Sequence, residues 1–176
     1  KFRDAQDRLG TQMRAVGEVM SIGKTYKEAF QKAVRSLEIG RFGLGFAKDY
    51  HEKPLEELMK MLSYPTSERQ FIMYEAKRKG ASVQELYKKT FIKPWFIQQM
   101  KELVDLEETI LKFKGKQLPD DLLIQAKKDG FADKYLTKLL GISETEIRQQ
   151  RLKAGLSQAW DYVPVSGAEN ARYYYS

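Results

Sequence analysis

The stretch GTQMRAVGEVMSIGKTYKEAFQKAVRSLEIG, residues 10–40, has two unlike halves that decide how the rest of the chain is organised. In residues 11–23, apolar residues and glycines alternate without a helical period, which is typical of extended segments and tight turns. In the second half, Thr25 and Glu28 fit a capping box, and apolar residues then recur at helical spacing up to Gly40. The stretch therefore predicts extended chain that gives way to a helix.

The composition indicates a globular protein that contains no cysteine. Of its 176 residues, 42% are hydrophobic and 12% aromatic, enough to bury a core in one large domain or two small ones. The absence of cysteine excludes a disulfide framework and thiolate metal sites. No apolar run approaches the ~20 residues that span a bilayer, so we expect a cytoplasmic protein with no membrane partner. The first residue is Lys1 and the chain ends on a tyrosine-rich tail, so we expect a piece of a longer protein.

The net charge of +7 raises the question of a nucleic-acid partner, because clustered cations neutralise phosphates. Most of the basic clusters fall at the ends of expected helices, where cations complement the negative end of the helix dipole. We interpret them as solvated surface; they include residues 77–79, 88–89, 127–128 and 148–153.

Beyond residue 40, apolar periodicity predicts one helix after another, separated by proline and glycine. Pro54 suits the first turn of a helix, and Ser82 with Glu85 repeats the capping-box pattern. The longest expected helix begins at Pro94 and continues to Gly115, and we expect it to be the central helix of the body. From residue 156 the helical pattern stops and the tail reads as extended. The fold class is therefore mainly α, with about seven or eight helices and short extended α/β remnants at both ends.

Two aromatic residues stand at the entrance of this longest helix, Phe91 and Trp95. A base-stacking platform would need a sheet to present the rings, so we expect them to form part of the core. His51 is the only histidine and has no partner at a catalytic spacing, so we expect a surface or capping role.

Residues 132–155 have the sequence form of a helix-turn-helix, with Gly141 in the turn. Its second helix would carry Arg148, Gln149 and Arg151 as candidate base readers. Tight helical hairpins use the same residues for packing and capping. A helix-turn-helix nucleic-acid-binding protein therefore stands as the alternative function.

No catalytic constellation assembles from these residues. The chain has no glycine-rich phosphate loop, no GxSxG and no HExxH pattern. The adjacent carboxylates at 107–108 and 120–121 point to different helix faces, and we interpret them as solvated charge. We therefore predict no catalytic, cofactor-binding or metal-ligating residue in this chain.

The string QMRAVGEVMSIG, residues 12–23, closely resembles the large chain of carbamoyl-phosphate synthetase. The likeness continues through Trp95 and Phe96, the string KDGFAD at 128–133, and residues 146–151. It covers nearly the whole chain, and the 12–23 string is far more specific than the helix-turn-helix pattern.

This resemblance implies a segment of an ATP-dependent ligase that makes carbamoyl phosphate from bicarbonate, ATP and glutamine-derived ammonia, for pyrimidine and arginine biosynthesis. Residues 1–24 would close the first ATP-grasp (carboxyphosphate) domain, 25–158 would form an all-helical oligomerisation domain, and 159–176 an extended linker toward the second ATP-grasp half. The implied partners are the two ATP-grasp halves, a glutaminase subunit or domain, and a second copy of the large chain. ATP and Mg (or Mn) would be bound elsewhere in the parent enzyme, and this segment alone would be inactive. Met13 matches a position near the wall of the carbamate tunnel, with ordinary core packing as the other interpretation.

The tail departs from the family pattern. The family exit usually reads Val-Asp-Thr, a small residue, then Ala-Ala-Glu, whereas Val165 is followed here by Ser-Gly-Ala-Glu-Asn. The connection to a second catalytic half is therefore the least supported part of the resemblance.

Overall fold

A computed structural model describes residues 7–11, 18–157 and 160–175, and in these residues it contains eight helices and one two-stranded hairpin. This confirms the predicted mainly α fold. The elements are α1 (Tyr26–Ser36), α2 (Leu55–Met61), α3 (Arg69–Arg78), α4 (Val83–Thr90), α5 (Pro94–Leu111), α6 (Asp120–Lys128), α7 (Asp133–Leu140), α8 (Glu144–Lys153), β1 (Asp161–Pro164) and β2 (Arg172–Tyr175).

Side-chain caps explain where several helices begin. Ser82 and Ser143 start α4 and α8 with complete capping boxes, as the sequence predicts for Ser82. At α1 the Thr25 hydroxyl accepts from the Glu28 N–H at 3.2 Å, but the Glu28 carboxylate accepts from the Lys24 N–H at 2.7 Å. Only half of the capping box predicted at Thr25 is therefore present, because the Glu28 carboxylate binds the backbone N–H of Lys24 instead of that of Thr25.

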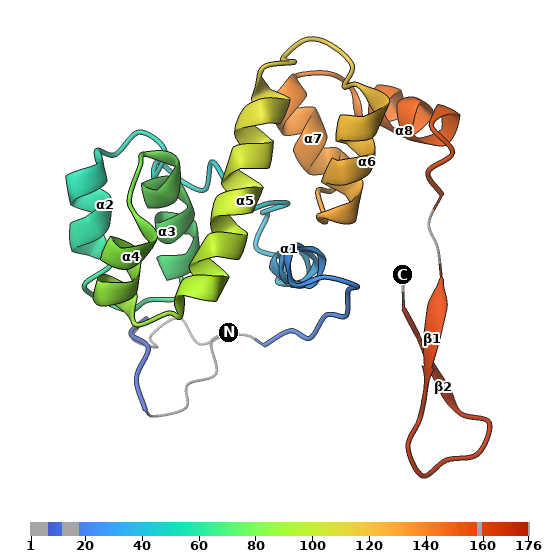
Figure 1. Cartoon of the computed structure of the whole chain (residues 1–176), viewed down its shortest axis with the longest axis horizontal. Helices are drawn as coiled ribbons and strands as arrows, with labels where there is room; N and C mark the ends of the chain where they lie inside the picture. Colours follow the sequence, from blue (N-terminus) through green and yellow to red (C-terminus); the bar gives the residue numbers. More distant parts are fainter. Residues whose placement is uncertain (1–6, 12–17, 158–159, 176) are drawn as a thin grey trace.

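Helix α5 is the central element of the body, as predicted. It packs against α3 and α4 on one side and against α1 and α7 on the other, with α2 on α3 and α8 on α6 and α7 (Figure 1). Helix α5 therefore joins two groups of helices into one core. Side chains without exposed surface come from both groups and from α5 itself: Leu58, Leu86, Ile97, Ile110, Leu123 and Leu136.

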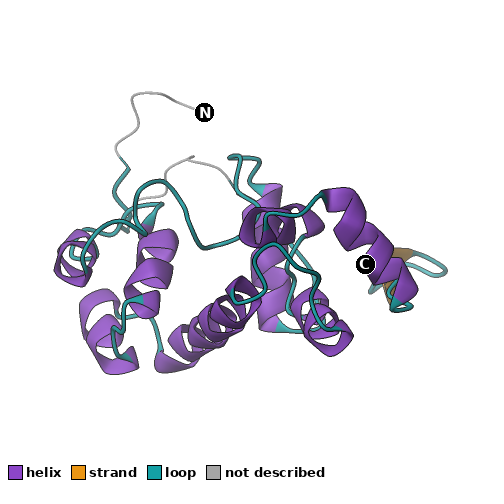
Figure 2. Cartoon of the chain, turned by 90° about the horizontal axis from the view of Figure 1, so that it is seen from above, coloured by secondary structure: helices purple, strands orange, loops and turns teal. Residues whose placement is uncertain are grey.

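The tail forms a hairpin outside this body. Strands β1 and β2 pair antiparallel, with Tyr162 opposite Tyr174 and Pro164 opposite Arg172. Viewed from above, the strands lie at one end of the molecule (Figure 2). The Arg172 guanidinium lies 4.2 Å from the centre of the Tyr162 ring, and all of β1 is exposed. The extended tail predicted from the sequence is confirmed as a strand pair with few contacts to the core.

No helix in the described ranges is long and apolar enough to cross a membrane.

Candidate functional site

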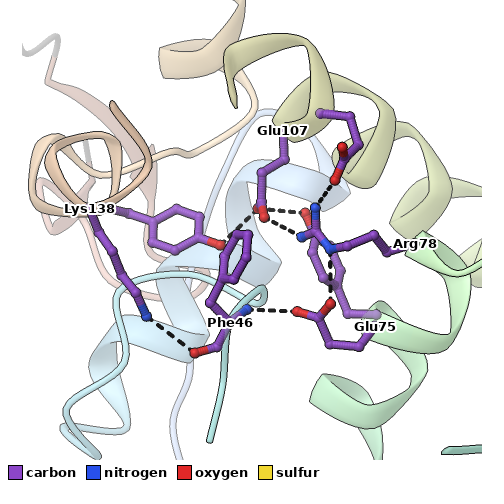
Figure 3. Close-up of polar contacts among 8 residues, drawn as sticks. Phe46, Glu75, Arg78, Glu107 and Lys138 are labelled. Atoms are coloured by element: carbon purple, nitrogen blue, oxygen red, sulfur yellow. Dashed lines mark hydrogen bonds and ion pairs between the residues drawn. The ribbon is translucent and has the colours of Figure 1, made fainter. Parts of the chain in front are cut away.

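Charged and phenolic side chains gather inside the body where α3, α5 and α7 meet (Figure 3). We call this set the central network: Tyr74, Glu75 and Arg78 of α3, Glu107 of α5 and Tyr135 of α7. The two carboxylates have no exposed surface (0%). Acidic side chains are almost never so buried unless they are paired, so each of these carboxylates is expected to have hydrogen-bonding or charged partners.

Glu107 is held by three donors. Its Oε2 accepts from the hydroxyls of Tyr74 and Tyr135, each at 2.8 Å, and its Oε1 accepts from the Arg78 guanidinium. Burial raises the pKa of Glu107 above its ordinary value, while Arg78 and the two tyrosines act to lower it. Burial and the nearby Glu107 charge raise the pKa of both tyrosines, so their hydroxyls stay protonated and keep donating.

Arg78 joins three carboxylates. Its Nε donates to Glu75 at 2.8 Å, and its two other nitrogens bind Glu107 and Glu108. Burial acts to lower the pKa of Arg78, but the fields of Glu107 and Glu75 outweigh it and raise that pKa. One permanent cation is thus shared by the two buried carboxylates, and the half-exposed Glu108 binds it from the surface side.

The loop of residues 41–53 closes over this network. The Phe46 N–H donates to Glu75 at 2.7 Å, and the Phe46 carbonyl accepts from Lys138 at 3.2 Å (Figure 3). Phe46 adopts a left-handed conformation with φ 55°, which costs an L-residue energy unless its surroundings hold it. At Gly45 a Cβ would meet Glu107, Tyr135 and Arg78, so only glycine lets the backbone pass this close.

The network is built to hold helices together and not to react. A general acid or base must have a substrate atom within hydrogen-bond reach, but both Glu107 oxygens are occupied by protein donors. Unlike the solvated role predicted for residues 107–108, only Glu108 is partly exposed while Glu107 is buried. The prediction for Glu107 was wrong because apolar periodicity cannot identify a buried charge whose partners come from other helices. Residues 120 and 121 are exposed, as predicted.

The aromatic residues at the start of α5 are not core, which corrects the prediction. Phe91 is 79% exposed, Trp95 55% and Phe96 40%. The rings of Tyr26, Phe30, Trp95 and Phe96 form an aromatic cluster with centroid distances of 5.0 to 5.4 Å. Pro94 starts α5 as predicted, and the two rings that follow it contact Tyr26 of α1 at the surface of the body. Phe91 is also left-handed, with φ 57°, an uncommon conformation for a bulky residue.

The predicted helix-turn-helix exists as two helices, α7 and α8, but its surface does not suit nucleic acid. Arg148 and Gln149 are exposed, whereas the Arg151 Nε lies 3.2 Å from the Asp133 carboxylate. One of the three candidate base readers is therefore engaged inside the protein. Glu144 and Glu146 occupy the first turn of α8, where a phosphate would approach.

Two other predicted positions remain. Met13 lies outside the described residues. His51 is half-buried and its ring packs 5.4 Å from that of Phe46, whereas we predicted a surface or capping role. Within the described ranges, no group of three or more His, Cys, Asp or Glu side chains could hold a metal ion.

Comparison with known proteins gives a consistent result. The family model for the oligomerisation domain of the carbamoyl-phosphate synthetase large chain matches residues 18–155. The chain is 41% identical over its full length to the carbamoyl phosphate synthase large chain of Archaeoglobus fulgidus, of which it covers 17%. It is 38% and 40% identical to the N-terminal sections of that large chain from Methanopyrus kandleri and Aquifex aeolicus, covering 34% and 31% of them. The chain thus spans a third or less of the relatives it matches.

Proposed function

Because the chain belongs to the family of carbamoyl-phosphate synthetase large-chain oligomerisation domains, we propose that it is the central scaffold and self-association segment of such a large chain. The parent enzyme would make carbamoyl phosphate from bicarbonate, ATP and glutamine-derived ammonia, for pyrimidine and arginine biosynthesis. ATP and Mg (or Mn) would bind in the ATP-grasp halves, and a glutaminase subunit or domain would supply ammonia. We also predict a cytoplasmic location.

The proposed division of the chain follows the change from irregular chain to helices. Residues 1–24 would end the first ATP-grasp domain, 25–158 would form the oligomerisation domain, and 159–176 would lead toward the second ATP-grasp half. Helix α1 begins at Tyr26 and α8 ends at Lys153, which supports the two boundaries. Met13 stays a prediction for the wall of the carbamate tunnel.

The central network supports a scaffold role, because it joins the helix groups on either side of α5. Glu75 and Arg78 come from α3, Glu107 from α5 and Tyr135 from α7, so one hydrogen-bonded set fixes the relative positions of three helices. Buried polar networks are rigid when every member is satisfied. A rigid body of this kind can hold flanking domains in a fixed relation.

The exposed aromatic cluster is the observation that carries the self-association proposal. Trp95 is 55% exposed and Phe96, whose ring it contacts, is 40% exposed. Contiguous exposed apolar surface marks interaction sites, and tryptophan is enriched among the residues that dominate interface energies. In a family named for oligomerisation, we propose that a second copy of the chain covers this cluster.

The parent activity can be tested on the complete reading frame that contains this chain, together with its partner section if the gene is split. The purified protein should form carbamoyl phosphate from bicarbonate, ATP and ammonia, whereas the 176-residue chain alone should not hydrolyse ATP. A reading frame without an ATP-grasp domain upstream of Lys1 would contradict the proposal.

A further inference from the structure

A cavity of about 830 Å³ opens between α1, the turn that joins α6 to α7, and α8. Its lining carries five lysines and two arginines against four carboxylates, which gives a formal charge of +3. Cations from distant parts of the sequence converge here, among them Arg35 of α1, Lys127 of α6 and Arg151 of α8. This volume lies within the range of small-molecule pockets, about 300 to 1,000 Å³.

At least three of the four carboxylates have partners within the protein. Asp133 accepts from Lys127 at 2.7 Å and lies 3.2 Å from the Arg151 Nε. Glu28 binds Lys32 at 2.7 Å and also caps the backbone at Lys24. The Asp161 carboxylate accepts from the Tyr162 N–H at 2.8 Å, and both Asp161 and Glu144 are exposed. The positive charge of the interior is therefore only partly balanced.

Arg35 is a partly buried cation in the cavity lining. Its Nη1 donates to the Gly130 carbonyl at 2.6 Å, which fixes the guanidinium at the cavity. Burial lowers the pKa of Arg35, while the negative charges of Glu28 and Asp133 act to raise it. The hydrogen bonds and ion pairs found for these two carboxylates go to groups other than Arg35. Burial likewise lowers the pKa of Lys127 despite its bond to Asp133. An anion in the cavity would stabilise both charged forms.

The start of α7 adds to the same field. Residues 132–134 line the cavity, and the N-cap residue is Ala132, whose methyl group cannot accept a hydrogen bond. Free backbone N–H groups and the positive end of the helix dipole favour anions at such a position. The lining also includes apolar residues, among them Phe42, Phe131 and Leu156, and the Lys134 Nζ lies 4.3 Å from the centre of the Phe42 ring.

We propose that this cavity binds a small organic phosphate, with the phosphate held by Arg35, Lys127 and the start of α7 and an apolar or ring portion against the partly exposed Phe42 and Leu156. The excess of three positive charges suits a phosphate dianion better than a single carboxylate. This site is independent of the proposed role in self-association.

Phenyl phosphate is a suitable probe, with inorganic phosphate, phenol and benzoate as matched comparisons. In a titration of the isotope-labelled chain at low ionic strength, followed by amide NMR, the signals of Gly130 and Ala132 should shift saturably with phenyl phosphate. Inorganic phosphate and benzoate should bind more weakly, and phenol should not shift these signals. Equal or tighter binding of phenol or benzoate would overturn the assignment of a phosphate site.

Variants separate a built site from general attraction to a basic surface. Arg35→Met should weaken phenyl phosphate binding by about tenfold or more, the loss expected for one charged hydrogen-bonding partner. Lys89→Ala removes an exposed cation on α4, away from the cavity, and should leave the affinity unchanged. Arg35 lies within α1, so the NMR spectrum of the Arg35→Met variant must retain the native dispersion for the comparison to count. Lys128→Ala is a milder second variant, because Lys128 is an exposed cation in the cavity lining. Wild-type affinity in both lining variants would overturn the proposal.

Discussion

Replacing Arg78 by Met tests the central network most sharply, because the change removes the charge and its donors while keeping an unbranched aliphatic stem. Glu75 and Glu107, both without exposed surface, then lose their shared cation. Breaking a buried ion pair by removing one partner costs about 3–5 kcal/mol. Exposed Glu108 adds little, because ion pairs at the surface contribute about 0–1 kcal/mol.

Protonation limits the part of this loss that comes from Glu107. In the variant, Glu107 can take up a proton instead of remaining a buried anion. From an ordinary pKa of 4.5, this costs up to about 3.4 kcal/mol at pH 7 and about 0.7 kcal/mol at pH 5, since one pH unit corresponds to about 1.4 kcal/mol. A carboxyl group whose pKa is raised on folding stabilises the folded state only below its unfolded pKa, and that contribution is lost as the pH rises.

Urea unfolding at several pH values measures both effects. We expect Arg78→Met to lower the free energy of unfolding by about 3 kcal/mol at pH 7 and by about 1 kcal/mol at pH 5. Arg148→Met, an exposed cation on α8, should stay within about 0.5 kcal/mol of wild type at both pH values. A loss below about 1 kcal/mol at pH 7, or a loss that does not change with pH, would refute the reasoning.

Two further predictions concern the same network. Tyr135→Phe removes one hydroxyl donor to Glu107 and should lower the free energy of unfolding by about 1–3 kcal/mol. Tyr162→Phe, in the exposed hairpin, should have little effect, so equal urea midpoints for the two variants would contradict this prediction. Gly45→Ala places a methyl group against Glu107 and Arg78 and should cost about 1–3 kcal/mol in thermal or urea unfolding. Gly10→Ala, with nothing within 4 Å of the added Cβ, is the matched control, and a Gly45→Ala variant as stable as Gly10→Ala would show that the loop does not pack as described.

Local signals in the sequence predict most of the helical body. Capping pairs such as Ser82 with Glu85, and Pro94 at the start of the longest helix, act within one turn, so the sequence alone can reveal them. The extended tail was also predicted, although its residue pattern does not specify the register that pairs Tyr162 with Tyr174. The family follows from the string at residues 12–23 together with the helical pattern.

Features that depend on several helices were not predictable from one sequence. Arg78 appeared as part of a basic run and Glu107 as part of an acidic pair, yet the two residues bind each other from different helices. Trp95 was assigned to the core from its hydrophobicity, but its position in the first turn of α5 directs it outward onto Tyr26. The cavity cation Lys127 was interpreted as part of a solvated, dipole-matched cluster for the same reason, since no periodicity indicates that α1 and α6 converge.

Sedimentation equilibrium of the chain tests the proposed scaffold and self-association role most directly. The account predicts an average mass that rises above the 20.5 kDa of the monomer as concentration increases, and a Trp95→Ala variant shifted toward 20.5 kDa. Trp160→Ala, which removes a 66% exposed tryptophan next to the hairpin, should associate like wild type. A wild-type chain that stays at 20.5 kDa at every concentration, or a Trp95→Ala variant that associates as well as wild type, would contradict self-association through the aromatic cluster.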